Sequence, residues 1–96
     1  MKHYIGIDLG TSAVKLLLMD AAGKIENTVT KEYPLEFPQP GWSQQNPEDW
    51  RKAILEGIPE LLSGFDAAQV GGIGCGGQMH GLVVLDEQDN VIRPAI

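Results

Sequence analysis

One carboxylate stands at the end of the first apolar segment of the chain, and hydroxyl side chains follow it directly. Asp8 lies within the stretch YIGIDLGTS, where Gly10, Thr11 and Ser12 come after it. An ionised carboxylate in an apolar strand costs free energy unless it is paired, hydrogen-bonded or bound to a cation. Beside a glycine turn it can hold a hydrated magnesium ion, while turn N–H groups and hydroxyls surround phosphate oxygens. With Lys15 as a possible positive partner, the pattern is compatible with a phosphate and magnesium site.

The same residues also permit a structural interpretation. Asp8 can accept hydrogen bonds within the turn, and Lys15 can be a solvated residue of the next strand. Spacing alone does not distinguish the two interpretations. A Ser-His-Asp arrangement cannot be inferred, because Ser12 lies in a glycine hairpin rather than in a nucleophile elbow.

A glycine cluster, GIGCGG, raises the question of a nucleotide fingerprint. Gly72, Gly74 and Gly77 match the literal pattern G-x-G-x-x-G. That pattern binds dinucleotides when it opens a helix and an acidic residue follows about 20 residues later. Here the alternation LVVL follows instead, so we interpret the match as chance. The glycines would rather let another backbone or a ligand approach the strand end closely.

Polar side chains follow this glycine cluster. Gln78 and His80 lie at the end of the predicted strand. A lone histidine in a loop is more often a structural hydrogen-bonder than a catalyst, and distant His3 and Cys75 do not complete a metal site with it. The residues alone therefore favour a structural role for His80.

Three predicted strands position the first candidate site. Apolar runs at 4–9 and 14–19 are separated by a short glycine turn, which indicates an antiparallel hairpin. The turn DAAG leads into a more polar strand at 24–32, which we expect at the sheet edge. The chain therefore opens with a three-strand meander.

A proline-rich segment and a helix connect this meander to the second candidate site. The segment PLEFPQPGWSQQNPEDW contains prolines that predict irregular structure up to Asn46, a typical N-cap before Pro47. Pro59 predicts a kink or break near Gly57, and Gly64 an end to the following turn. One helical face would carry Trp50, Ala53, Ile54, Gly57, Ile58 and Leu61.

The remaining elements predict a mixed sheet. The strand at 70–75 follows a helix, so the crossover should make it parallel to the first strand. Strands at 82–85 and 91–93 flank the turn DEQDN as a further hairpin. We therefore expect an α/β domain whose mixed sheet is covered on at least one face by a helix.

Composition limits the possible functions. Ninety-six residues with 43% hydrophobic content suit one small domain, and a net charge of −6 makes nucleic acid or an anionic membrane a poor partner. No run reaches the roughly 20 apolar residues that span a bilayer, and the amino end lacks a signal-peptide core. Together with the lone Cys75, this predicts a cytoplasmic protein.

Three segments, in order, resemble one family of enzymes. IGIDLGTSAVK is similar to the first phosphate motif of the FGGY carbohydrate kinases, within the actin, hexokinase and sugar-kinase superfamily of ATPases. GWSQQNPEDW resembles the family's W-S-x-Q-x-P-x-x-W segment, and GGQMHGLVVLDEQDNVIRPAI resembles the substrate-side segment of xylulokinases. The sequence Gln-Met-His-Gly favours this branch over glycerol kinase or gluconokinase.

The resemblance implies a ribonuclease-H-like fold and a phosphate site. Asp8 would coordinate Mg²⁺, directly or through water. Gly10, Thr11 and Ser12 would form the hairpin that faces the ATP phosphates, and Lys15 would lie near the transferred phosphoryl group.

The resemblance also implies a sugar site and a larger enzyme. Met79 and His80 would contact the ketose, with Gln78 beside them. The intact enzyme would transfer the ATP γ-phosphoryl group to the 5-hydroxyl of D-xylulose. Xylulokinases continue with Trp-x-Asp-x-Arg where this chain stops at Ile96, and their catalytic aspartate, second phosphate loop and adenosine site lie further on. Residues 1–96 would thus be a truncated, incomplete amino-terminal part of domain I, inactive alone.

Alternatives to this function remain open. The chain could be a non-catalytic module, one half of a split protein, or part of a kinase for another ketose or polyol. Because truncation would leave sheet and helix surface uncovered, we also expect self-association.

Overall fold

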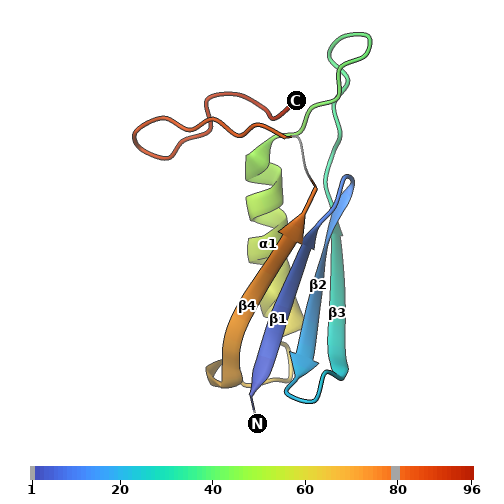
Figure 1. Cartoon of the computed structure of the whole chain (residues 1–96), viewed down its shortest axis with the longest axis vertical. Coiled ribbons are helices and arrows are strands. Elements are labelled where there is room, and N and C mark those ends of the chain that lie inside the picture. The colour runs from blue at the N-terminus through green and yellow to red at the C-terminus, as the bar shows by residue number, and fades with distance from the viewer. Residues whose placement is uncertain (1, 79–80) are drawn as a thin grey trace.

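The computed structural model describes residues 2–78 and 81–96, which form a mixed sheet with one long helix (Figure 1). The sheet order is β3-β2-β1-β4. β1 pairs antiparallel with β2, β2 pairs antiparallel with β3, and β4 lies parallel to β1. The predicted meander, the edge position of its third strand and the parallel crossover are therefore confirmed. The elements are β1 (His3–Leu9), β2 (Ala13–Asp20), β3 (Ile25–Glu32), α1 (Pro47–Leu61), a short 3-10 helix (Ala67–Gln69) and β4 (Val70–Gly77).

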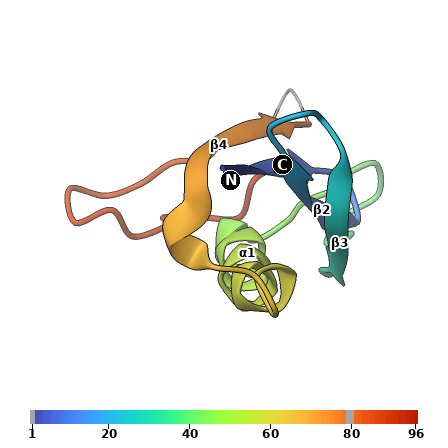
Figure 2. The same cartoon turned by 90° about the horizontal axis from the view of Figure 1, so that it is seen from below.

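Strand alternation divides the sheet into two faces. Ile5 and Ile7 of β1 are buried on the same side as Val14, Leu16 and Leu18 of β2. Successive strand residues point to opposite faces, so the residues between them lie on the other face. α1 covers only the first of these faces, as the view along the strands shows (Figure 2). In the described part of the chain no helix covers the second face, which by the same alternation carries Asp8.

α1 begins as the sequence predicts and then continues further. The side chain of Asn46 accepts a hydrogen bond of 3.0 Å from the N–H of Glu48, and Pro47 occupies the first helical position. Of the predicted kink or break near Gly57, the break is wrong, because α1 runs without interruption to Leu61. Pro59 lies in the last turn, so little helix follows it for a kink to redirect. Packing of the buried helix face on the sheet holds this turn in place.

Gly57 marks close contact between helix and sheet. A Cβ atom added there would lie 2.4 Å from Cδ1 of Leu16, a fully buried side chain of β2. Glycine at this position therefore lets α1 approach β2 more closely than any other residue would allow. Gly57 thus belongs to the packed face of α1, as its helical spacing predicts.

The segment after β4 forms a hairpin of limited extent. An isolated bridge joins Leu85 and Val91, and the N–H of Ile92 donates to the carbonyl of Val84 at 2.9 Å. Within the described ranges, the two strands predicted there are reduced to this pairing. Leu82 and Ile92 are 71% and 60% exposed, so the described residues do not cover this hairpin with a second layer.

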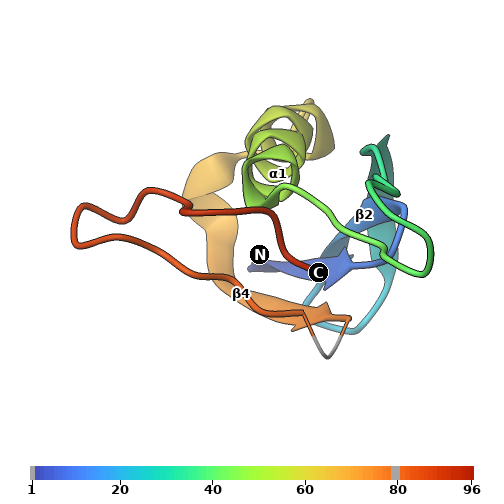
Figure 3. The ribbon, with the colours of Figure 1, turned by 90° about the horizontal axis from the view of Figure 1, so that it is seen from above.

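Several segments meet at one end of the sheet. The β1–β2 hairpin, the carboxyl end of β4, the start of α1 and the last residues of the chain lie at this end (Figures 1 and 3). Residues from each of these segments are placed close together despite their separation in sequence. None of the helices in the described ranges has the length and apolar character needed to cross a membrane.

Candidate functional site

Asp8 and Lys15 are direct neighbours on the helix-free face. They are cross-strand partners in the β1–β2 pair, and Gly76 of β4 lies beside Asp8 on its other side. Cross-strand partners project on the same side of a sheet. Both charged side chains are exposed, so the structure brings the predicted metal ligand and its predicted positive partner together on an open surface.

Bare backbone surrounds Asp8 on the β4 side. A Cβ atom at Gly74 or Gly76 would meet nothing within 4 Å, so the space above these residues is open. The glycines lie inside β4, which runs to Gly77, and no helix follows in the described part of the chain. This agrees with the interpretation that the G-x-G-x-x-G match is accidental. It leaves room for a ligand to approach the backbone next to Asp8.

The predicted phosphate hairpin is a tight turn. The N–H of Gly10 donates to the carbonyl of Ala13 at 2.9 Å. A Cβ atom at Gly10 would lie 2.9 Å from that same oxygen, so glycine is needed here for close approach. The side chains of Thr11 and Ser12 are exposed at the tip. Both hydroxyl-bearing residues are thus accessible to a ligand.

Tyr33 forms two hydrogen bonds with the backbone of this hairpin. Its buried side chain donates a hydrogen bond through the hydroxyl to the carbonyl of Gly10. Its backbone N–H donates to the carbonyl of Ser12 at 3.1 Å. Burial, and then the nearby charge of Asp8, raise the pKa of the Tyr33 hydroxyl. The hydroxyl therefore stays protonated and keeps its role as a donor.

Gln45 connects the hairpin to the other segments at this end of the sheet. Its side chain is buried, and Nε2 donates to the carbonyl of Thr11. Its Oε1 accepts hydrogen bonds from Nε1 of Trp50 at 3.2 Å and from Nε2 of Gln78 at 2.8 Å. Its backbone N–H and carbonyl pair with Ala95 at 2.8 and 2.7 Å. Sequence reasoning missed this residue, which figured there only as part of a motif.

A small cavity lies between the hairpin and Gln78. Its volume is about 180 Å³. Thr11 of the predicted phosphate hairpin and Gln78 of the predicted sugar site both line this cavity. Met79 and His80, the predicted ketose contacts, lie outside the described residues. The lining residues are Thr11, Leu35, Ser43, Gln44, Gln45, Trp50, Gln78, Gly81, Ala95 and Ile96.

Asp8 is compatible with a magnesium ion of one particular kind. No group of three or more His, Cys, Asp or Glu side chains gathers for a metal in the described ranges. Mg²⁺, however, is usually bound through one or two carboxylates, with waters and substrate phosphates supplying the other oxygens. A single exposed carboxylate beside a hydroxyl-bearing hairpin fits that donor set.

Comparison with known proteins identifies the family. Residues 3–96 match the N-terminal domain of the FGGY family of carbohydrate kinases. The chain belongs to this family. It is 49% identical over 98 residues to a xylulose kinase of Bacillus subtilis strain 168, covering 100% of this chain and 20% of that protein.

Solved structures of FGGY kinases agree with the fold. A xylulose kinase from Lactobacillus acidophilus superposes with a TM-score of 0.92 at 33% identity, over 100% of this chain and 19% of that one. A gluconate kinase from the same organism gives a TM-score of 0.92 at 34% identity, over 99% and 19%. The incomplete α/β domain of ribonuclease-H-like type is thereby confirmed. The FGGY chain described here spans about a fifth of the length of these relatives.

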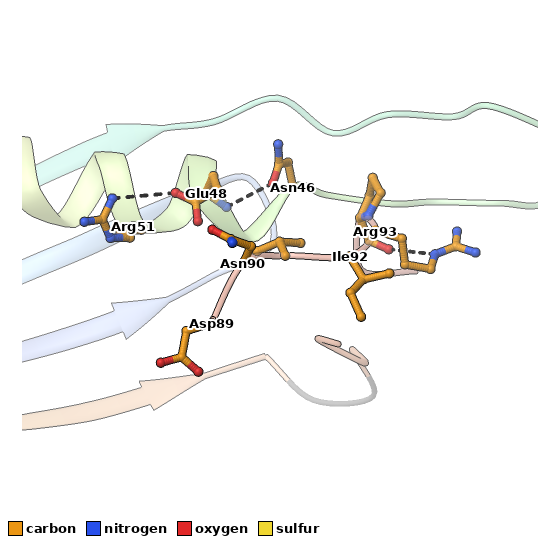
Figure 4. A pocket seen from close by; sticks show the side chains of 9 residues that line it. Asn46, Glu48, Arg51, Asp89, Asn90, Ile92 and Arg93 are labelled. Atoms are coloured by element: carbon orange, nitrogen blue, oxygen red, sulfur yellow. Dashed lines mark hydrogen bonds and ion pairs between the residues drawn. The ribbon is translucent and has the colours of Figure 1, made fainter. Parts of the chain in front are cut away.

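A larger hollow of this FGGY chain lies away from the phosphate hairpin. It has a volume of about 720 Å³ and lies between the start of α1 and residues 89–94 (Figure 4). Arg51 and Glu48 form an ion pair of 3.6 Å on one wall, and Nε of Arg93 donates to its neighbouring carbonyl at 3.2 Å on the other. These polar groups already have partners. None of the described residues predicted for the phosphate, metal or sugar site lines this hollow.

Proposed function

We propose that this chain is the amino-terminal part of an ATP-dependent kinase that phosphorylates D-xylulose at its 5-hydroxyl. The observation that supports this most is the joining of the Gly10–Ser12 hairpin to Gln78 through Gln45. A phosphate-facing turn and the strand end that precedes the Gln-Met-His-Gly segment then lie on either side of one cavity. The names of similar proteins supply the sugar.

The hairpin residues would bind and orient the ATP phosphates. Backbone N–H groups and the exposed hydroxyls of Thr11 and Ser12 would contact phosphate oxygens without adding charge. Lys15 would offset negative charge near the transferred group, since it lies next to Asp8 in the register. Asp8 would hold Mg²⁺, which when bound neutralises phosphate charge. In this proposal residues 1–96 form the first part of kinase domain I.

The sugar would be held from the β4 side. Gln78 is oriented by Gln45 at 2.8 Å, and its backbone N–H donates to the carbonyl of Leu9 at 2.9 Å. In the proposal Met79 and His80 then contact the ketose. The base that accepts the hydroxyl proton, and the adenosine site, would come from the four-fifths of the relatives' length that this chain does not match. A cytoplasmic location belongs to the same proposal.

A chimeric protein, called the joined protein, tests this function directly. Residues 1–96 would replace the matching segment of the Bacillus subtilis xylulose kinase, and ATP consumption would be measured in a coupled assay. We expect turnover with D-xylulose, and a loss of about a hundredfold or more in the Asp8→Asn variant, because metal and phosphate charge are then poorly neutralised.

Controls separate this proposal from its alternatives. The 96-residue chain alone should show no turnover, and Gln88→Met, an exposed change in a distant turn, should leave the joined protein active. Because the gluconate kinase superposes equally well, gluconate, glycerol and other ketoses belong in the acceptor panel. Faster turnover of one of these would correct the sugar. Inactivity on every acceptor would contradict the kinase proposal and favour a non-catalytic module, whereas activity restored by mixing separate parts would favour a split protein.

A further inference from the structure

The side-chain amide of Gln45 forms hydrogen bonds with three residues that are far apart or on different elements. Its residue is 4% exposed, so each polar atom must find a partner inside the protein. The amide donates through Nε2 to Thr11 and accepts at Oε1 from Trp50 and Gln78. The reverse orientation of the amide would set an oxygen against a carbonyl and an NH₂ group against two donors. The three partners therefore fix one orientation.

The partners of Gln45 belong to segments with separate proposed tasks. Thr11 lies in the hairpin proposed to bind phosphate, and Gln78 begins the loop proposed to contact sugar. The positions paired through these side chains are 34 and 33 residues apart from Gln45 in sequence. A second bond joins the same two segments, because the N–H of Gln78 donates to the carbonyl of Leu9. One buried side chain thus connects the two segments to which these tasks are proposed.

We infer that Gln45 is a positioning residue that sets the distance between the phosphate hairpin and Gln78 at the end of β4. This inference rests on the proposed function. Gln45 does not touch the reacting atoms in this assignment; it acts through the carbonyl of Thr11 and the amide of Gln78. Phosphoryl transfer depends on an in-line arrangement of donor and acceptor, and a misplacement of about 1 Å can lower a rate by about a hundredfold.

The Gln45→Met variant tests this in the joined protein. Methionine has a similar length and flexibility but lacks the amide, so packing is kept while the connection is lost. We expect kcat to fall about tenfold or more, with the KM values for ATP and sugar changed by less than about threefold. Gln88→Met, the same substitution in an exposed turn, serves as the matched control and should change neither.

Hydrogen exchange supplies a second readout that needs no turnover. In the Gln45→Met protein, the N–H groups of Gly10 and Gln78 should both exchange faster, whereas in Gln88→Met they should not. An unchanged kcat together with unchanged exchange would overturn the inference. Raised KM values for both substrates with an unchanged kcat would also overturn the inference.

The same measurements keep this inference separate from the proposed function. If the unsubstituted joined protein is inactive on every acceptor, the kinase proposal fails. Exchange then decides the inference alone: faster exchange at both amides supports the connection through Gln45, and exchange at only one of them, or at neither, overturns it.

Discussion

At the scale of single residues, buried neutral groups organise the candidate site, and the charged groups lie on its surface. Tyr33 and Gln45 are both buried, and each donates to a backbone carbonyl of the hairpin. Asp8 and Lys15 are exposed. Neutral hydrogen bonds cost less to bury than unpaired charges do, so they can fix the backbone while the charges stay available for ligands.

Asp20 offers a pH-dependent test at the same scale. Its carboxylate accepts N–H bonds of 2.9 Å from Lys24 and from Ala22, and these, the Lys24 bond first, lower its pKa. The stabilisation is therefore present above the ordinary aspartate value of about 3.9 and is lost as the pH falls through the lower pKa of the folded state. In urea unfolding, Asp20→Asn should lose more stability at about pH 7 than at about pH 3.

Glu87→Gln is the control for the change in net charge that Asp20→Asn also causes. Glu87→Gln removes one carboxylate from an exposed turn elsewhere on the surface. If the stability difference between the wild type and Asp20→Asn stays constant with pH, the assigned cause of the pKa shift is contradicted.

At the scale of elements, the close contact of α1 with β2 explains why position 57 is a glycine. Gly57→Ala should gain about 1 kcal/mol of helix propensity but lose about 1–3 kcal/mol from overpacking against Leu16. We expect net destabilisation of about 1 kcal/mol in chemical unfolding, because Leu16 is fully buried and has little room to move. Leu55→Ala, an exposed change on the same helix, should have a much smaller effect.

A double-mutant cycle makes this prediction specific. In a Leu16→Ala background the atom that a new Cβ would strike is absent. Gly57→Ala should then be neutral or stabilising. Equal destabilisation in both backgrounds would show that the contact is not the cause.

The same elements show what could be predicted from the sequence. The strand meander and the parallel crossover follow from local patterns, since alternation and short turns act between near neighbours. The role of Gly57 does not, because it depends on Leu16, 41 positions earlier in the chain, by the numbering of the two residues. Gln45 could not be identified for the same reason, as its partners Thr11 and Gln78 are 34 and 33 positions away. The hairpin after β4 is shorter than its alternating pattern predicts. A local pattern does not show whether another element covers the apolar face of a hairpin.

At the scale of the whole molecule, β4 is the element with the least cover. It is an edge strand, and Ile73 lies beside the buried Ile5 on the α1 side yet is 58% exposed. Unpaired edge backbone next to an apolar side chain favours pairing with a second copy. We therefore expect the 96-residue chain to associate as its concentration rises in sedimentation velocity, and Ile73→Lys to weaken this because a charge would be buried in the contact. Ile92→Lys, at a 60% exposed position away from β4, should leave association unchanged. A monomer at every concentration, or equal effects of the two substitutions, would contradict this assignment.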